Sequence, residues 1–169
     1  RGMPRPKPPF PPIKGLYQRP TVVNNVETLC TLPHLIKEGV EWFNRIGTEK
    51  SRGSKLISIS GDCKRPGVYE VAMGIKLSEV LRLAGAQDAA AVQVGGPSGQ
   101  MVGPSDYDRA ICYDDLATGG SIMVFGPERD ILEVVHSFLD FFVEESCGYC
   151  TPCRAGNVLL KNGIEKLLA

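Results

Sequence analysis

The middle of the chain switches between strand-like and helix-like patterns of hydrophobic residues. Residues 55–60 alternate apolar and polar side chains, as a half-buried strand does, and a turn rich in Gly and Pro follows them. A later segment places Leu and Val at helical spacing and ends at Gly85. The predicted elements are strands at 55–60, 68–71, 91–94 and 120–125 and a helix at 76–84. This order predicts an α+β roll over residues 54–126, with the helix packed on one face of the sheet.

Helical patterns flank this roll on both sides. Residues 24–45 repeat apolar side chains at three- and four-residue steps, with Asn24 or Asn25 as the N-cap, and breaks at Pro33 and Gly39 predict two short helices. After the roll, residues 129–143 form a helix capped by Asp130, and a further helix starts at Cys153, after a Thr-Pro pair that suits a helix N-terminus. The last two helices are expected to begin a helical bundle.

The first 20 residues are rich in proline, with six of the thirteen prolines among the first twelve residues. Such a run favours extended backbone with few hydrogen bonds and cannot build its own core. It can be a ligand for a small peptide-binding domain. An arm packed across a larger enzyme is the favoured interpretation.

Composition narrows the class of protein. Nineteen basic and nineteen acidic residues cancel, so no electrostatic footprint for nucleic acid is visible, and no uncharged stretch is long enough to span a bilayer. Six cysteines without a secretory segment favour a reducing compartment, and the cytoplasm is expected, including the cytoplasmic side of a membrane. Because the chain opens without an initiator methionine, it is expected to be a piece of a longer protein.

Three cysteines at three-residue steps, Cys147, Cys150 and Cys153, carry the most specific chemistry in the chain. Thiolates clustered on a short loop are typical of iron–sulfur ligation, and Gly148 permits the sharp backbone path between them. Zinc and a dithiol redox pair are alternatives, but zinc sites usually pair two separated Cys-x-x-Cys steps, and a dithiol uses only two thiols. An iron–sulfur cluster is favoured.

A four-thiolate cluster needs one more cysteine, and no cysteine follows Cys153. Cys30, Cys63 and Cys112 lie in upstream segments of different character and are each expected to be a single buried or half-buried residue. The fourth ligand is therefore expected outside this chain.

With these motifs in view, the chain resembles the flavin- and NADH-binding subunit of respiratory NADH dehydrogenase (complex I). It also resembles the diaphorase subunits of NAD-reducing hydrogenases and NAD-dependent formate dehydrogenases. The motifs that carry the resemblance are Pro20-Thr-Val-Val-Asn-Asn-Val-Glu-Thr28, Gly95-Gly-Pro-Ser-Gly99 and Glu145-Ser-Cys-Gly-Tyr-Cys-Thr-Pro-Cys-Arg154.

The resemblance implies cofactor sites at both ends of the chain. It implies that FMN is contacted by Val23, Asn24, Asn25 and Thr28. It also implies that Cys147, Cys150 and Cys153 are three of the four ligands of a [4Fe–4S] cluster. Without the resemblance, two asparagines that merely cap a helix are the simpler explanation.

The resemblance further implies a domain order. Residues 1–52 are the arm and final helices of a flavin domain, 53–126 are a β-grasp domain of the soluble-ligand-binding type, and 127–169 begin a helical iron–sulfur domain. Whether the β-grasp domain takes a ligand or acts as a spacer stays open.

The expected function is an NADH dehydrogenase or diaphorase subunit that passes electrons between NAD(H), FMN and the cluster and on to partner subunits, one of them an iron–sulfur protein. No catalytic acid or base is expected here, since His34 and His136 lie on apolar helix faces. The 169 residues alone are expected to be inactive. The alternative is a non-catalytic β-grasp binding module, and the sequence leaves the electron acceptor open.

Overall fold

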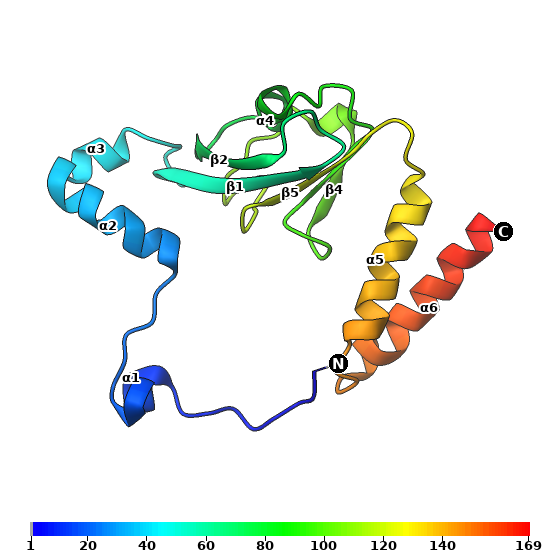
Figure 1. The fold of residues 1–169 in the computed structure, drawn as a ribbon, viewed down its shortest axis with the longest axis horizontal. Helices are drawn as coiled ribbons and strands as arrows, with labels where there is room; N and C mark the ends of the chain where they lie inside the picture. The colour runs from blue at the N-terminus through cyan, green and yellow to red at the C-terminus, as the bar shows by residue number, and fades with distance from the viewer. Residues whose placement is uncertain (1) are drawn as a thin grey trace. The chain divides into compact units, whose positions relative to one another are not determined.

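The computed structural model describes residues 2–169, which form two compact units (Figure 1). One unit is Val26–Arg129, and the other comprises Asp130–Ala169 together with the residues up to Asn25. The elements of the first unit are α2 (Val26–Glu38), α3 (Val40–Asn44), β1 (Ser54–Gly61), β2 (Gly67–Ala72), α4 (Leu77–Ala84), β3 (Ala91–Val94), β4 (Gln100–Val102), the 3₁₀ turn η2 (Pro104–Asp106) and β5 (Ser121–Phe125). The elements of the second are α1 (Pro11–Lys14), the 3₁₀ turn η1 (Leu16–Gln18), α5 (Ile131–Glu145) and α6 (Thr151–Leu168).

The five strands form one mixed sheet in the order β2-β1-β5-β3-β4. β1 and β5 run parallel, with Ser58 opposite Ser121 and Gly61 opposite Val124, and every other neighbouring pair is antiparallel. Two hairpins, β1–β2 and β3–β4, are therefore joined through the central strand β5. A parallel pair needs a long crossover connection, and the chain between β1 and β5 supplies it.

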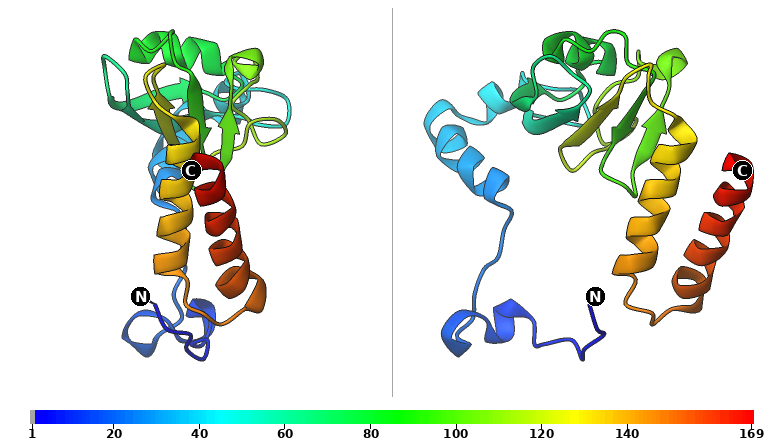
Figure 2. Two further views of the ribbon diagram at one scale, coloured as in Figure 1. Left: turned by 90° about the vertical axis from the view of Figure 1, so that its right-hand side faces the viewer. Right: turned by 45° about the vertical axis from the view of Figure 1, so that its right-hand side comes forward.

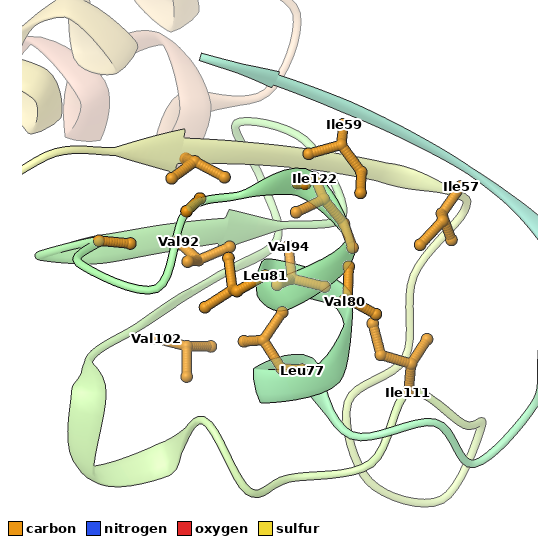
Figure 3. Close-up of a cluster of buried hydrophobic side chains, with 14 of the residues drawn as sticks. Ile57, Ile59, Leu77, Val80, Leu81, Val92, Val94, Val102, Ile111 and Ile122 are labelled. Atoms are coloured by element: carbon orange, nitrogen blue, oxygen red, sulfur yellow. The ribbon is translucent and has the colours of Figure 1, made fainter. Parts of the chain in front are cut away.

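The core lies between the sheet and α4, which covers one face (Figures 1 and 3). Leu77, Val80 and Leu81 of α4 are fully buried. They cluster with apolar side chains of the sheet, namely Ile57, Ile59, Val92, Val94 and Ile122. Val124 of β5 belongs to the same buried cluster. Each such side chain contributes about 1.5–3 kcal/mol through burial. Gly85 ends the helix in the left-handed conformation at φ 69°, which a glycine adopts without strain.

The structure confirms the predicted mixed fold and corrects several details of it. The predicted strands and helix are present, but the sequence analysis missed β4, a three-residue strand directly after the Gly95–Gly99 turn. α2 runs through Pro33 and ends only before Gly39, because the φ of proline suits a helix even where its missing N–H removes one bond. The proline-rich run is not extended throughout, since α1 and η1 interrupt it.

The apolar stripe predicted for residues 24–45 is largely exposed in the structure. Val26 and Ile36 are 72% and 82% exposed, and Cys30, expected to be at least half buried, is exposed too. Helical spacing predicts which side chains share a face, but it does not predict whether a neighbouring element covers that face. Cys63 and Cys112 follow the expectation, one partly buried and one buried.

α5 and α6 pack side by side as an antiparallel pair (Figures 1 and 2). Asp130 caps α5 as predicted, and its Oδ1 accepts a hydrogen bond from the Leu132 N–H at 2.8 Å. Within residues 2–169, no helix combines the length and the apolar character that crossing a membrane requires.

The carboxylate of Asp62, directly after β1, binds the segment that follows β5. Asp62 accepts hydrogen bonds from Nε and Nη2 of Arg129, at 2.7 and 2.8 Å, and from the Gly126 N–H at 3.0 Å. The two-pronged contact with Arg129, followed by the Gly126 N–H, holds the pKa of Asp62 well below its usual range. The interaction therefore favours the folded state whenever Asp62 is ionised.

Limited proteolysis should leave a resistant product close to residues 54–126. The sheet and α4 close one core, so cleavage within it requires global unfolding, whereas the flanking helices α2, α3, α5 and α6 contain no buried residue. Mass spectrometry of the products along a time course measures this. Early cleavage inside the span would contradict an autonomous sheet domain.

The stabilising effect of Asp62 should fade in acid. Its pKa is lowered in the folded state, so the unfolded chain takes up the proton first. The contribution is complete above the unfolded pKa of about 3.9, shrinks below it, and is lost only as the pH falls through the lowered pKa of the folded state. Asp62→Asn should lower the urea midpoint at pH 7, and its gap to wild type should narrow steadily as the pH is lowered from about 4 towards 2. Asp88→Asn, at an exposed carboxylate, is the matched control. A constant gap between Asp62→Asn and wild type across this range would refute the pH dependence.

Candidate metal centre and flavin segment

The cysteine motif occupies the turn that connects α5 with α6. α5 ends at Glu145, Gly148 takes the left-handed conformation at φ 76°, and α6 begins at Thr151. α6 therefore begins two residues before the predicted start at Cys153, and its N-cap is Cys150. Pro152 lies in the first turn, where its missing N–H would have no helical partner. The turn therefore reverses the direction of the chain, and the cysteines lie at the N-terminal end of α6, where the helix dipole is positive.

The three thiols share this turn but do not close on one point. Cys147 and Cys150 are exposed, and Cys153, in the first turn of α6, is partly buried. In residues 2–169, no three or more His, Cys, Asp or Glu side chains are gathered closely enough to hold a metal ion. Metal-ligand sites are rarely preformed, because the bound metal itself draws thiolates together.

Hydrogen bonds to sulfur in this turn converge on Cys153. Ser146 Oγ lies 3.4 Å from the Cys153 Sγ, and Asn157 Nδ2 donates to the same sulfur at 3.5 Å. Ser146 Oγ also accepts the Gly148 N–H at 3.2 Å, and Arg154 donates to the Gly148 carbonyl at 3.1 Å. The sequence analysis missed Ser146 and Asn157. The only signal for Asn157 was its position one helical turn after a cysteine.

The chemistry of this donor set fits an iron–sulfur cluster. Three thiols, an amide N–H that donates to sulfur and a helix N-terminus all favour an anionic group ligated by thiolates. Space is also available, since nothing lies within 4 Å of where a side chain would start at Gly148.

Charged side chains fix how α5 and α6 align. Lys161 of α6 pairs with Asp140 of α5 and, through this contact, lowers the pKa of that carboxyl. His136 contacts both Asp140, at 3.5 Å, and Glu165, at 3.2 Å. His136 is therefore part of a polar network between the helices rather than an apolar packing residue. This alignment brings Ser146, at the end of one helix, next to Cys153, at the start of the other.

The residues expected to contact flavin lie around the start of α2. Val23, Asn24 and Asn25 precede the helix, and Thr28 is in its first turn. All four side chains are exposed, so their amide and hydroxyl groups are accessible to a ligand. The assignment of these residues to flavin stays a prediction.

Glu27, in the same motif, has a role that sequence reasoning did not identify. Its Oε1 accepts the Leu56 backbone N–H at 2.7 Å, and its Oε2 pairs with Lys55 Nζ at 3.1 Å. Burial opposes ionisation, but the hydrogen bonds from Leu56 and Lys55 outweigh it, and the pKa of Glu27 is lowered. Glu27 thereby ties the start of α2 to β1, a contact across 29 residues that no local pattern could indicate.

Comparisons with known proteins agree with this geometry. Residues 133–169 match the family model of the NADH-ubiquinone oxidoreductase-F iron–sulfur binding region. The chain is 49% identical to the alpha subunit of the NAD-reducing hydrogenase HoxS of Cupriavidus necator, over 100% of this chain and 28% of that protein. It is 37% identical to the F subunit of NADH-quinone oxidoreductase of Escherichia coli, over 92% of this chain and 38% of that protein.

Solved structures show the same relationship. The crystal structure of an NAD+-reducing [NiFe]-hydrogenase in the H2-reduced state matches with a TM-score of 0.83 and 42% identity, over 98% of this chain and 29% of that chain. The chain thus spans about a quarter to two fifths of the length of these relatives. The resemblance inferred from the motifs is confirmed: along nearly its whole length the chain is similar to one part of NADH-quinone oxidoreductase F subunits and of NAD-reducing hydrogenase alpha subunits.

Proposed function

We propose that this chain is part of a flavoprotein subunit that oxidises NADH or reduces NAD and passes electrons between NAD(H), FMN and a [4Fe–4S] cluster. The observation that carries this proposal is the turn at residues 146–153, where three thiols share one turn within the matched iron–sulfur binding region and Asn157 donates to the sulfur of Cys153.

In this proposal Cys147, Cys150 and Cys153 hold the cluster, with a fourth ligand from elsewhere in the protein. When bound, a [4Fe–4S] cluster supplies a one-electron carrier. The chain contributes the positive end of α6, which favours the anionic ligand set, and the α5–α6 charge network, which keeps the turn in place.

The flavin segment has a complementary role. Val23, Asn24, Asn25 and Thr28 would contact FMN through amide, hydroxyl and apolar groups exposed at the start of α2. When bound, FMN supplies the conversion between two-electron and one-electron transfer. Glu27 supports the segment by fixing the first turn of α2 to β1.

The sheet domain is best described as a β-grasp domain of the soluble-ligand-binding type. Two hairpins around a parallel β1–β5 pair, with α4 on one face, support this assignment. The domain order then follows as a flavin-domain end at 1–52, the β-grasp domain at 53–126 and the start of an iron–sulfur domain at 127–169. Its role is that of a spacer between the two cofactor regions.

The protein would act within a multi-subunit redox complex that includes an iron–sulfur partner, since the relatives are named as subunits of a hydrogenase or of NADH-quinone oxidoreductase. We place it in the cytoplasm or on the cytoplasmic side of a membrane. Six free cysteines, three of them assigned as ligands, are consistent with a reducing compartment.

The cluster assignment is tested by removing one thiolate. Cys150→Ser in the full-length protein should abolish or severely reduce cluster iron and sulfide, because serine is a poor replacement for a thiolate ligand. Cys30→Ser, at an exposed thiol of α2, should leave both unchanged. Iron and sulfide analysis together with the visible absorption spectrum decides the question. A full-length protein with no flavin or iron–sulfur absorption would sink the proposed function.

The 169-residue chain alone should hold no stable [4Fe–4S] cluster. Three thiolates leave one iron without its protein ligand, and cluster stability depends on the complete set. Anaerobic reconstitution followed by iron and sulfide analysis measures this. Four irons per short chain would show that another group supplies the last ligand.

Asn25→Ala in the full-length protein should weaken FMN binding. Losing one or two hydrogen bonds to the ligand, at about 1 kcal/mol each, raises Kd by roughly five- to thirtyfold. Flavin retained after extensive dialysis is the measurement, and Asn44→Ala, at an exposed position of α3, is the control. Equal flavin retention in both variants, with intact iron content, would leave helix capping as the role of Asn25.

A further inference from the structure

We infer that Asn157 and Ser146 are positioning residues that raise the reduction potential of the cluster by donating hydrogen bonds to the sulfur of Cys153. This inference rests on the proposed function, because it assumes that Cys153 is a cluster ligand. It goes further by assigning unequal roles to the three cysteines and by naming the residues that make them unequal.

The contact between Asn157 and Cys153 is built into α6. The two residues are four positions apart, so their side chains lie on the same face of the helix, and Asn157 Nδ2 is 3.5 Å from Cys153 Sγ. Both residues are partly buried. The helix backbone sets this spacing, so Asn157 is placed to donate to the sulfur of Cys153.

Ser146 approaches the same sulfur from the end of α5. Its position is fixed because it is 7% exposed and its backbone N–H bonds to the Phe142 carbonyl at 3.1 Å. Its Oγ also accepts the Gly148 N–H at 3.2 Å. A ligating thiolate has no proton of its own, so the bond across 3.4 Å must run from the Ser146 hydroxyl to the Cys153 sulfur.

These donors favour the reduced state of the cluster. Reduction adds negative charge that is shared by the ligand sulfurs, and a donor stabilises a sulfur more strongly as that charge grows. Hydrogen bonds to sulfur therefore raise the reduction potential. Two donors act on Cys153, whereas Cys147 and Cys150 are exposed, so the effect is concentrated on the ligand nearest the helix interface.

The test compares two substitutions of Asn157 in the full-length protein. Asn157→Leu keeps a side chain of similar size but removes the donor, and Asn157→Asp keeps the shape but replaces the donor by an anionic acceptor. An anaerobic redox titration, followed by low-temperature EPR of the reduced cluster, measures the midpoint potential. Asn162→Leu, at an exposed position on the same helix, is the matched control.

The expected order of midpoint potentials, from highest to lowest, is wild type, then Asn157→Leu, then Asn157→Asp. The leucine variant should show a roughly three- to tenfold smaller equilibrium constant for reduction, where tenfold corresponds to about 59 mV for a one-electron couple. Ser146→Ala should shift the potential in the same direction, and Asn162→Leu should not shift it. Iron and sulfide content should stay at the wild-type level in every variant.

The outcomes separate this inference from the proposed function. A wild-type protein without a cluster would overturn both. A normal cluster whose potential is unchanged in both Asn157 variants would overturn the tuning role and leave the proposed function intact. Loss of the cluster in both variants would show that Asn157 holds the cluster rather than tunes it, and this too would overturn the inference.

Discussion

The antiparallel packing of α5 against α6 is the constraint on which the geometry of the cysteine turn depends. Two helices joined by only residues 146–150 have little freedom, and the pairs Lys161–Asp140 and His136–Glu165 select one alignment along their length. In that alignment Ser146, which caps the C-terminal end of α5, lies beside Cys153 in the first turn of α6. Exposed ion pairs contribute little to stability, so their effect here is on register more than on free energy.

The sheet unit is stabilised in a different way. Most of its stability comes from burial of apolar side chains, because α4 packs against strands that contribute Ile and Val. A few polar contacts, such as Asp62 with Arg129, add to this. Even buried Gln93 is satisfied, since its amide donates to the Gly96 carbonyl at 2.6 Å. The unit therefore closes its core with its own side chains.

Local signals predicted much of this structure. The alternation of β1, the glycine that ends α4 and the Asp130 cap depend only on neighbouring residues, and each lies where it was expected. β4 was missed because three residues are too few to establish an alternating pattern. The sequence analysis placed the start of the last helix at Cys153, whereas α6 begins at Thr151. Capping preferences do not fix the terminal residue of a helix.

The site was predictable only in part. The spacing of the cysteines shows that they share a turn, and the matched iron–sulfur region agrees with that chemistry. The spacing does not show that the surroundings of Cys153 differ from those of the other two cysteines. That difference depends on Ser146, which follows α5 and contacts Cys153 in α6. Contacts between distant segments, such as Glu27 with Leu56, require the tertiary structure, since each residue looks ordinary in its own neighbourhood.

The contact of Glu27 with Leu56 also bears on how the sheet avoids joining other sheets. Ser58 donates its N–H to Gly120 on the β5 side of β1, and Leu56, two residues earlier, directs its N–H the same way, beyond the point where β5 begins. That N–H would otherwise be a free donor on a short stretch of open strand edge, the kind of site at which chains aggregate by pairing strands. The carboxylate of Glu27 occupies it, and the negative charge also repels an incoming backbone carbonyl. Glu27, which lies among the residues predicted to contact flavin, thus protects β1 of its own compact unit from intermolecular strand addition.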